Sequence, residues 1–348
     1  MTGSSLLVER ASAEWSAALA QVRHDVYHLP GYGTVDAGPG ETPMAFVHRE
    51  GDSVFLLPLV LRPIPDSTLR DARSPYGYPG PISNVAAGGA DGAAFWQRAV
   101  EALVATLCSA GVISCFVRSN PLFDVPTDVL AAAGEVVTHG LTVAVDLTQT
   151  PEELWSATRS NHRRQINRAR RDGVTVGVDD WSRLPEFVAI YHETMKRVGA
   201  TDFYFFDDAY FSALRAELPD NVHLIVAEHE GVSLAGGLFF ACDGITQYHL
   251  GATRDDALSR QPMKLVQADA MIWARERGDR AFHLGGGLGG TDDPLFHFKA
   301  GFSSWHLPFA TWRVVTDPVA YARLTAERAP DVDVSDLVHF FPAYRESA

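Results

Sequence analysis

A glycine-rich segment followed by a single lysine offers the clearest chemistry in the sequence. Residues 282–302 read FHLGGGLGGTDDPLFHFKAGF, where five glycines occupy six positions and Lys299 follows in an aromatic stretch. Glycine lets a backbone approach a ligand closely because it has no Cβ. Only three lysines occur among the 29 lysine and arginine residues, so a lysine here fits a need for a compact ammonium. The segment predicts either a ligand-binding turn or a flexible connection between a strand and a helix.

The glycine spacing also matches a dinucleotide fingerprint, Gly285-x-Gly287-x-x-Gly290. In a true fingerprint the glycines open a long helix of a βαβ unit, and an acidic residue follows about 20 residues later. Here Asp292, Asp293 and Pro294 follow at once, before a short aromatic segment. We therefore expect no NAD or FAD. The sequence also contains no GxSxG elbow and no GxxxxGK loop.

Length and composition predict a protein with about two domain cores and no metal. The chain has 348 residues, of which 46% are hydrophobic. No apolar run is long enough to span a membrane and the first residues lack a signal-peptide pattern, so we expect a cytoplasmic protein, and we expect a monomer. The three cysteines lack CxxC spacing, and His24 and His28 lack the glutamate of HExxH, which argues against a metal site.

A basic strip contrasts with the net charge of −14. The overall charge argues against broad nucleic-acid binding, although it leaves room for a local basic patch. Residues 154–173 carry six arginines, and no acidic residue occurs from 154 to 171. A helix here would bury Trp155, Ile166 and Ala169. Its basic face is either an ordinary solvated surface or a phosphate contact, and we expect Arg163, Arg164 and Arg168 to bind phosphate.

The order of elements is similar in the two halves of the chain. Each half reads as a helix, a hairpin, a long helix ended by glycine, and a strand. The strands and helices expected are 44–47, 54–61, 93–110 and 112–117 in the first half, and 222–227, 234–241, 245–250, 262–277 and 281–284 in the second. This repetition predicts an α+β fold with two tandem acetyltransferase-like (GNAT) domains, with mixed sheets flanked by helices. We expect residues 1–148 with 310–348 to form the first domain and 149–309 the second.

The loop that would bind acetyl-CoA in such a fold departs from the usual pattern. Acetyl-CoA-dependent members carry a glycine-containing loop whose amides hold the pyrophosphate at a helix N-terminus. The corresponding residues 254–261, RDDALSRQ, have no glycine and place Asp255 and Asp256 where phosphate would lie. Acetyl-CoA is therefore disfavoured as the donor.

Several segments together resemble the Fem-type (FemABX) aminoacyltransferases. The matching segments are YGYPGP at 76–81, NHRRQINRA at 161–169, YHLGA at 248–252, WARERG at 273–278 and FKxGF at 298–302. The resemblance covers most of the chain and is most specific from the glycine run to FKxGF. Fem-type enzymes have two such domains in tandem and move an amino acid from aminoacyl-tRNA to an amine on a peptidoglycan precursor. Some relatives act on small molecules in natural-product pathways.

The resemblance implies roles for particular residues. Lys299, beside Phe298, would stabilise the oxyanion that forms when an amine attacks the ester, while Phe298 forms a wall of the site. The alternative for Lys299 is a cap at the end of a short helix. A set of further side chains is expected to contact the substrates: Tyr204, Arg197, Tyr248, Tyr76 and Arg254. No metal or other cofactor is implied.

The sequence differs from the Fem-type family in two respects that affect the predicted mechanism and tRNA contact. Many Fem enzymes place an acid before the proline at the end of the first-half strand, whereas Arg118-Ser119-Asn120-Pro121 has asparagine, which cannot act as a general base. The coiled-coil arm of some members is also absent. The sequence predicts an aminoacyltransferase that uses aminoacyl-tRNA and an amine acceptor. The alternatives are an N-acyltransferase with an acyl-CoA or carrier-protein donor, and a non-catalytic binding module of the same fold.

Overall fold

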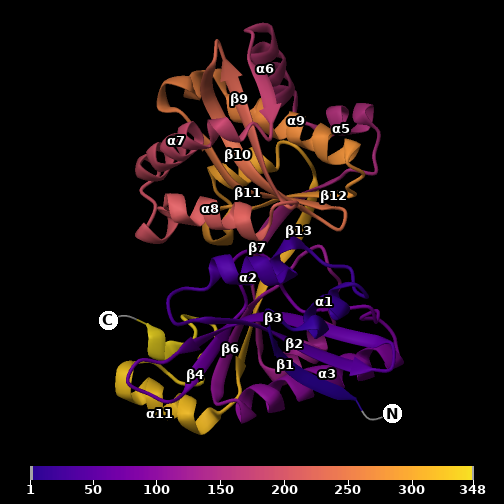
Figure 1. Ribbon diagram of the computed structural model, residues 1–348, viewed down its shortest axis with the longest axis vertical. Coiled ribbons are helices and arrows are strands. Elements are labelled where there is room, and N and C mark those ends of the chain that lie inside the picture. The colour runs from indigo at the N-terminus through magenta and orange to yellow at the C-terminus, as the bar shows by residue number, and fades with distance from the viewer. Residues whose placement is uncertain (1–2, 347–348) are drawn as a thin grey trace. The chain divides into compact units, whose positions relative to one another are not determined.

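The computed structural model describes residues 3–346 and divides the chain into two compact units (Figure 1). Unit 1 comprises residues 1–139 and 308–348, and unit 2 comprises residues 140–307. Strands β7 (Glu135–Asp146) and β13 (Trp305–Val315) both cross the division along the chain, so the C-terminal segment belongs to the first unit.

Unit 1 is built on a mixed sheet in the order β1-β2-β3-β4-β6-β13. Strands β4 and β6 are parallel, the other pairs in this order are antiparallel, and β5 (Ile82–Ser83) adds to β3. The remaining strands are β1 (Ser4–Glu9), β2 (Thr42–Glu50), β3 (Ser53–Pro63), β4 (Arg70–Arg73) and β6 (Val112–Arg118). The helices are α1 (Ala13–Leu19), α2 (Pro30–Asp36), α3 (Ala90–Ser109), α4 (Thr127–Ala133) and α11 (Pro318–Arg328).

Both faces of the unit 1 sheet are buried, because strand residues alternate between two cores. On β3, Phe55 and Leu57 face the cluster that contains helix α3, whereas Val54 and Leu56 face the cluster that contains α1. This explains why β3 reads as a continuous apolar run rather than as an alternating one. A third cluster joins α11 to the C-terminal segment around Tyr344.

The strands of unit 2 form a mixed sheet in the order β7-β12-β11-β10-β9-β8. Strands β11 and β12 are parallel, and the other pairs are antiparallel. Its other strands are β8 (Thr175–Val178), β9 (Val222–His229), β10 (Val232–Cys242), β11 (Ile245–Thr253) and β12 (Ala281–Gly286). The helices are α5 (Pro151–Ala157), α6 (Ser160–Arg171), α7 (Leu184–Arg197), α8 (Asp208–Glu217), α9 (Pro262–Glu276) and α10 (Pro294–Lys299).

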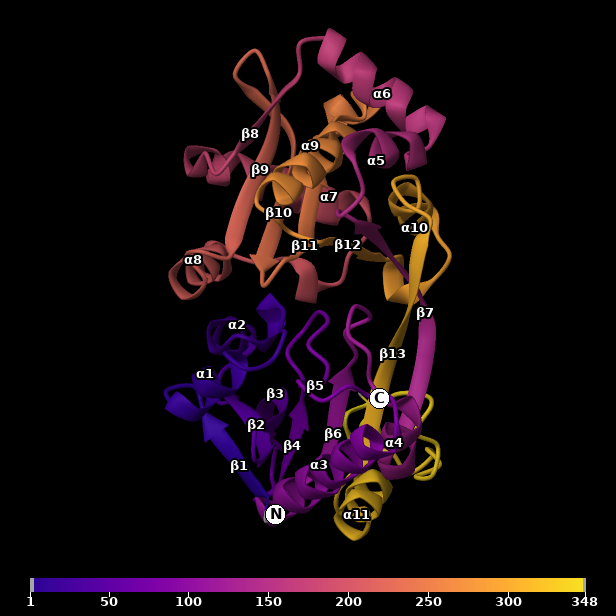
Figure 2. The same cartoon turned by 90° about the vertical axis from the view of Figure 1, so that its right-hand side faces the viewer.

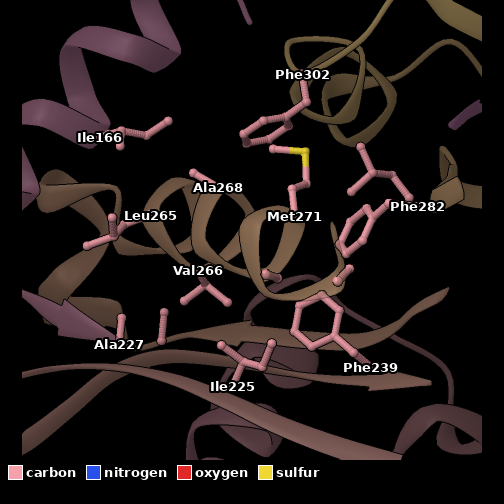
Figure 3. Packing of buried hydrophobic residues seen from close by; sticks show 14 of the residues in the cluster. Ile166, Ile225, Ala227, Phe239, Leu265, Val266, Ala268, Met271, Phe282 and Phe302 are labelled. Atoms are coloured by element: carbon pink, nitrogen blue, oxygen red, sulfur yellow. The ribbon is translucent and has the colours of Figure 1, made fainter. Parts of the chain in front are cut away.

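Helix α9 covers one face of this sheet and α7 covers the other (Figures 1 and 2). Figure 3 shows the α9 face, where Leu265, Val266 and Met271 pack with sheet residues such as Phe239. Phe302, from the segment after α10, is part of the same cluster. The core therefore connects the sheet, the long helix and the lysine-bearing segment.

Most predicted elements are confirmed, with local corrections. The basic helix expected over 154–173 is two helices, α5 and α6, separated at Thr158 and Arg159. The expected burial of Ile166 and Ala169 is confirmed, but Trp155 is exposed. Among the six aromatic residues between 203 and 211, Phe211 is fully buried, and the other rings are half-buried or exposed.

Candidate functional site

Strands β11 and β12 are paired with each other over only part of their lengths. Their parallel pairing joins Ile245 to Ala281 and ends at Gln247 and His283, although both strands continue. On their other edges β11 pairs with β10, and β12 pairs with β7, both before and after this point. Backbone and side-chain groups between the parted strands therefore have no common ladder and are available to other partners.

Lys299 lies where β11 and β12 are no longer paired with each other, a place called the parting below. It is the last residue of α10 and is only 8% exposed. Its Nζ donates a hydrogen bond to the carbonyl oxygen of Gly286, at the end of β12, over 2.6 Å. The ammonium also lies 5.8 Å from the ring centroid of Tyr248, the first residue of β11 after the pairing stops. The side chain thus bonds to a strand carbonyl, and its hydrogen bond does not cap its own helix.

The glycine turn between β12 and α10 fixes the position of Lys299. Asp293 caps α10 by accepting from the backbone N–H of Phe296 at 2.7 Å, and its other oxygen accepts from the N–H of Leu288 at 2.8 Å. A Cβ on Gly287 would lie 2.5 Å from the Asp293 carboxylate and 2.2 Å from the Thr291 carbonyl oxygen. The turn therefore requires glycine at 287 for close packing, and it is an ordered connection.

Burial lowers the pKa of Lys299 from 10.5 to about 8, and the nearby Asp293 carboxylate partly opposes this shift. The side chain is therefore mainly an ammonium at neutral pH. No described carboxylate lies within 4.0 Å of Nζ, so its charge is not neutralised by an ion pair. Neighbouring His283 has its pKa lowered to about 3 by burial and by the Lys299 charge, so it is neutral.

Tyr248 and Phe298 flank the lysine. The Tyr248 hydroxyl contacts the sulfur of Met263 at 3.7 Å, and burial raises its pKa, so the side chain is a neutral phenol. Phe298 is half-buried against the main core of unit 2. The structure thus brings Tyr248 to Lys299, whereas the Phe298 ring packs on His162 and Phe302.

Arg197 and Arg254 are already engaged with acids. Arg197 forms an ion pair with Asp255 and donates to the carbonyl oxygen of Thr253 at 3.1 Å, while Arg254 pairs with Asp256. Arg254 and both aspartates line an open cavity of about 570 Å³, together with Glu186 and Glu193. This lining is mainly acidic, which disfavours a diphosphate at the loop that precedes α9.

Tyr204 and Tyr76, which were also predicted to contact substrates, have partners different from those of Tyr248. Tyr204 lies in a short 3₁₀ turn (Asp202–Tyr204), half-buried, and its carbonyl accepts from the Tyr191 hydroxyl at 2.7 Å. Tyr76 belongs to unit 1, where the Arg118 guanidinium lies 4.9 Å from its ring centroid. Their contact with a substrate stays a prediction.

Helix α6 presents a stripe of arginines. Arg164, Arg168 and Arg171 are exposed at i, i+4 and i+7, on the face opposite buried Ile166. Arg163 is turned back to the end of α5, where it donates to the carbonyl oxygens of residues 155 and 156. Of the three predicted phosphate contacts, Arg164 and Arg168 therefore point to solvent more fully than Arg163.

Asn120 has a partner that sequence reasoning missed. Its Nδ2 donates to the carboxylate of buried Asp25 at 3.0 Å and to the carbonyl oxygen of Tyr78 at 2.7 Å. The amide thus ties the loop at 74–81 to the end of β6. Asp25 precedes a 3₁₀ turn at Val26–His28 and caps it. This capping position is the only feature near Asp25 in the sequence that could have drawn attention to it.

Two features are absent from the described residues, 3–346. No group of three or more His, Cys, Asp or Glu side chains in this range could hold a metal ion. Within the same range, no helix has both the length and the apolar character needed to cross a bilayer.

Comparisons with known proteins identify the fold. Residues 156–299 match the family model of the acetyltransferase (GNAT) domain. The chain is similar to the crystal structure of FemX, with a TM-score of 0.68 and 16% identity, covering 92% of this chain and 99% of that one. A search of curated protein sequences found no significant match.

Two other solved structures share this architecture. The C-terminal domain (DUF2156) of a putative lysylphosphatidylglycerol synthetase from Agrobacterium fabrum matches with a TM-score of 0.55 and 16% identity, covering 86% of this chain and 91% of that one. A conserved protein of unknown function from Bacteroides thetaiotaomicron VPI-5482 matches with a TM-score of 0.52 and 10% identity, covering 78% and 86%. The predicted tandem GNAT fold and the resemblance to Fem-type proteins in fold are confirmed.

The lowered pKa of Lys299 predicts how stability depends on pH. Between about pH 8 and 10.5 the unfolded chain binds a proton at this lysine that the folded chain has lost, so stability rises with pH. The free energy of unfolding of the wild type, relative to Lys299→Met, should therefore increase by about 2–3 kcal/mol from pH 7 to pH 10. Urea unfolding at both pH values measures this, and an equal difference at the two values would contradict the shifted pKa.

Proposed function

We propose that this protein is an aminoacyltransferase that moves an amino acid from aminoacyl-tRNA to an amine acceptor. The observation that carries the proposal is the buried Lys299 ammonium, which is charged at neutral pH and has no described carboxylate within ion-pair distance. Such a group can stabilise an oxyanion strongly because few other charges or waters screen it. The fold shared with FemX and the Fem-type segments support an aminoacyl donor.

The reaction needs no cofactor, because the ester of the donor is already activated. The acceptor nitrogen attacks the ester carbonyl, whose oxygen becomes an oxyanion near Lys299. The C–O bond to the ribose then breaks, an amide forms, and the proton lost by the amine goes to the leaving ribose oxygen. Phe298 would form a wall of the site, and Tyr204, Tyr248 and Arg197 would contact the acceptor.

The choice of a tRNA donor over acyl-CoA rests on charge. The loop before α9 carries Asp255 and Asp256, which disfavour a pyrophosphate there even though each is paired with an arginine. Helix α6 displays a stripe of exposed arginines, of which Arg168 also pairs with Asp172. The putative lysylphosphatidylglycerol synthetase, which shares this fold, is named for making an aminoacylated lipid. An amine on a peptidoglycan precursor or on a natural-product intermediate would suit the Fem-type resemblance.

Transfer from acyl-CoA or a carrier protein is the first competing proposal. A binding module without turnover is the second.

A donor experiment tests the proposal. The protein is incubated with radiolabelled aminoacyl-tRNA pools and candidate amine acceptors, with and without ribonuclease. We expect an amide product that disappears when the tRNA is digested beforehand. Product from acyl-CoA that is insensitive to ribonuclease would contradict the proposal, and binding without turnover of either donor would support the binding module.

Removing the ammonium should slow the transfer step. Lys299→Met should lower the single-turnover rate by about 10²–10³-fold, because a stabilising charge on the oxyanion is lost. Lys196→Met is the matched control, since Lys196 is exposed on α7 and should leave the rate unchanged. Equal rates for wild type and Lys299→Met would remove the lysine from the reaction.

The arginine stripe predicts a salt dependence. Log affinity for tRNA should fall less steeply with log salt in the double variant Arg164→Gln/Arg168→Gln. The steepness should drop by about 2, because two phosphate contacts are lost. Arg70→Gln/Arg323→Gln makes the same charge change at exposed positions of unit 1 and serves as the control. Equal slopes for wild type and the α6 variant would show that the stripe does not meet phosphate.

A further inference from the structure

The start of helix α6 holds the end of helix α10, which carries Lys299. The ring nitrogen Nε2 of His162 lies 2.9 Å from the carbonyl oxygen of Phe298. The backbone N–H of Arg159 donates to the carbonyl of Gly301 at 2.8 Å, and its guanidinium donates to the carbonyl of His297 at 3.3 Å. Carbonyls at a helix C-terminus lack partners within the helix, so these bonds fix the last turn of α10 from outside.

The His162 ring is fitted closely to this turn. It is 5% exposed, and its centroid lies 5.8 Å from that of Phe298 and 4.9 Å from that of Phe302. A Cβ on Gly301 would come within 2.2 Å of Nε2. The glycine of FKxGF thus provides room for the histidine of the segment 161–169, which connects two sequence motifs that lie far apart along the chain.

The protonation state of His162 follows from its surroundings. Burial lowers its pKa, Lys264 and Arg159 lower it further, and the Phe298 carbonyl opposes them, so the ring is neutral at pH 7. A carbonyl oxygen can only accept, so Nε2 carries the proton and donates it. The buried Nδ1 has no hydrogen-bond partner among residues 3–346. The hydrogen bond to Phe298 is therefore the polar interaction that holds this ring.

We propose that His162 is a positioning residue for Lys299. It grips the carbonyl of the preceding residue, Phe298, and so sets the path of a helix of only six residues, too short to be stable alone. The role rests on the proposed function, in which α6 meets donor phosphates and Lys299 meets the oxyanion. A displacement of about 1 Å at a reacting group can cost about 10²-fold in rate, so this grip matters to the chemical step.

The first test separates the hydrogen bond from simple packing. His162→Leu removes the donor, whereas His162→Gln places an amide N–H near the position of Nε2. We expect the single-turnover rate at saturating aminoacyl-tRNA to fall about 10–100-fold in His162→Leu and to recover mostly in His162→Gln, with donor affinity within about twofold. His339→Leu makes the same substitution at an exposed histidine of unit 1 and should leave the rate within about twofold of wild type.

Two results of this test would overturn the proposal. One is a His162→Gln variant as slow as His162→Leu, because the donated hydrogen bond would then be irrelevant. The other is a loss that appears only in donor affinity, because His162 would then belong to tRNA binding. Thermal unfolding of each variant identifies any that fail to fold.

A cycle with Gly301 gives an independent measurement. Gly301→Ala should slow the reaction in the wild-type background, because its Cβ would displace the His162 ring. The double variant His162→Ala/Gly301→Ala should be no slower than His162→Ala alone, because the ring is no longer there to displace. Additive losses would contradict the coupling.

Hydrogen exchange distinguishes failure of this proposal from failure of the proposed function. Without any substrate, amides of residues 294–302 should exchange faster in His162→Leu than in wild type, and at the wild-type rate in His162→Gln. This order would support the positioning role even if no aminoacyl-tRNA is consumed, in which case only the proposed function fails. Unchanged exchange in His162→Leu would overturn the positioning role, whatever the protein transfers.

Discussion

The hydrogen bond between the Lys299 ammonium and the Gly286 carbonyl is the interaction on which the candidate site depends. A buried ammonium costs several kcal/mol of desolvation unless polar groups replace water. Here the replacements are one carbonyl at 2.6 Å, the face of Tyr248 at 5.8 Å, and the more distant charge of Asp293. These groups are enough to keep the lysine charged near neutral pH and too few to neutralise it. That balance is what an oxyanion-stabilising group requires.

The surrounding fold provides that balance. The parting of β11 and β12 after Gln247 and His283 creates the place for the side chain, and the glycine turn returns the chain to it. Asp293 caps α10 and binds the turn at the same time, while His162 and Arg159 hold the other end of the helix. Phe302 anchors the segment in the core around α9 (Figure 3). In the loop at 254–261, Asp255 pairs with Arg197 and Asp256 pairs with Arg254.

Strong local signals in the sequence predicted much of this structure. The hairpins around Gly51 and Gly231, the long helix α9 with Pro262 in its first turn, and the end of β12 in glycines all follow from turn chemistry and periodicity. The break between α5 and α6 was not predicted, because Thr158 and Arg159 include no glycine or proline. Ile272 of α9 is 47% exposed although it is apolar, since the helix packs on one side only.

The site could be predicted only in part, because its contacts link distant parts of the chain. Lys299 was identified from its motif, but no local pattern indicates that its partner is a carbonyl 13 residues earlier. Arg197 and Arg254 were predicted to contact substrates, and the structure adds that Arg197 pairs with Asp255 and Arg254 with Asp256. The contact between His162 and the end of α10 spans 136 residues and needed the folded chain to be seen.

The charge state of Lys299 can be measured directly, because the protein has only three lysines. Selective isotope labelling of lysine would give three side-chain NMR signals, and the signal missing from the Lys299→Met spectrum identifies this residue. We predict that this signal titrates with a pKa of about 8 in the folded protein. A pKa at or above 10.5 would contradict this prediction. The ammonium would then be solvated, or neutralised by an acid, and not buried where β11 and β12 separate.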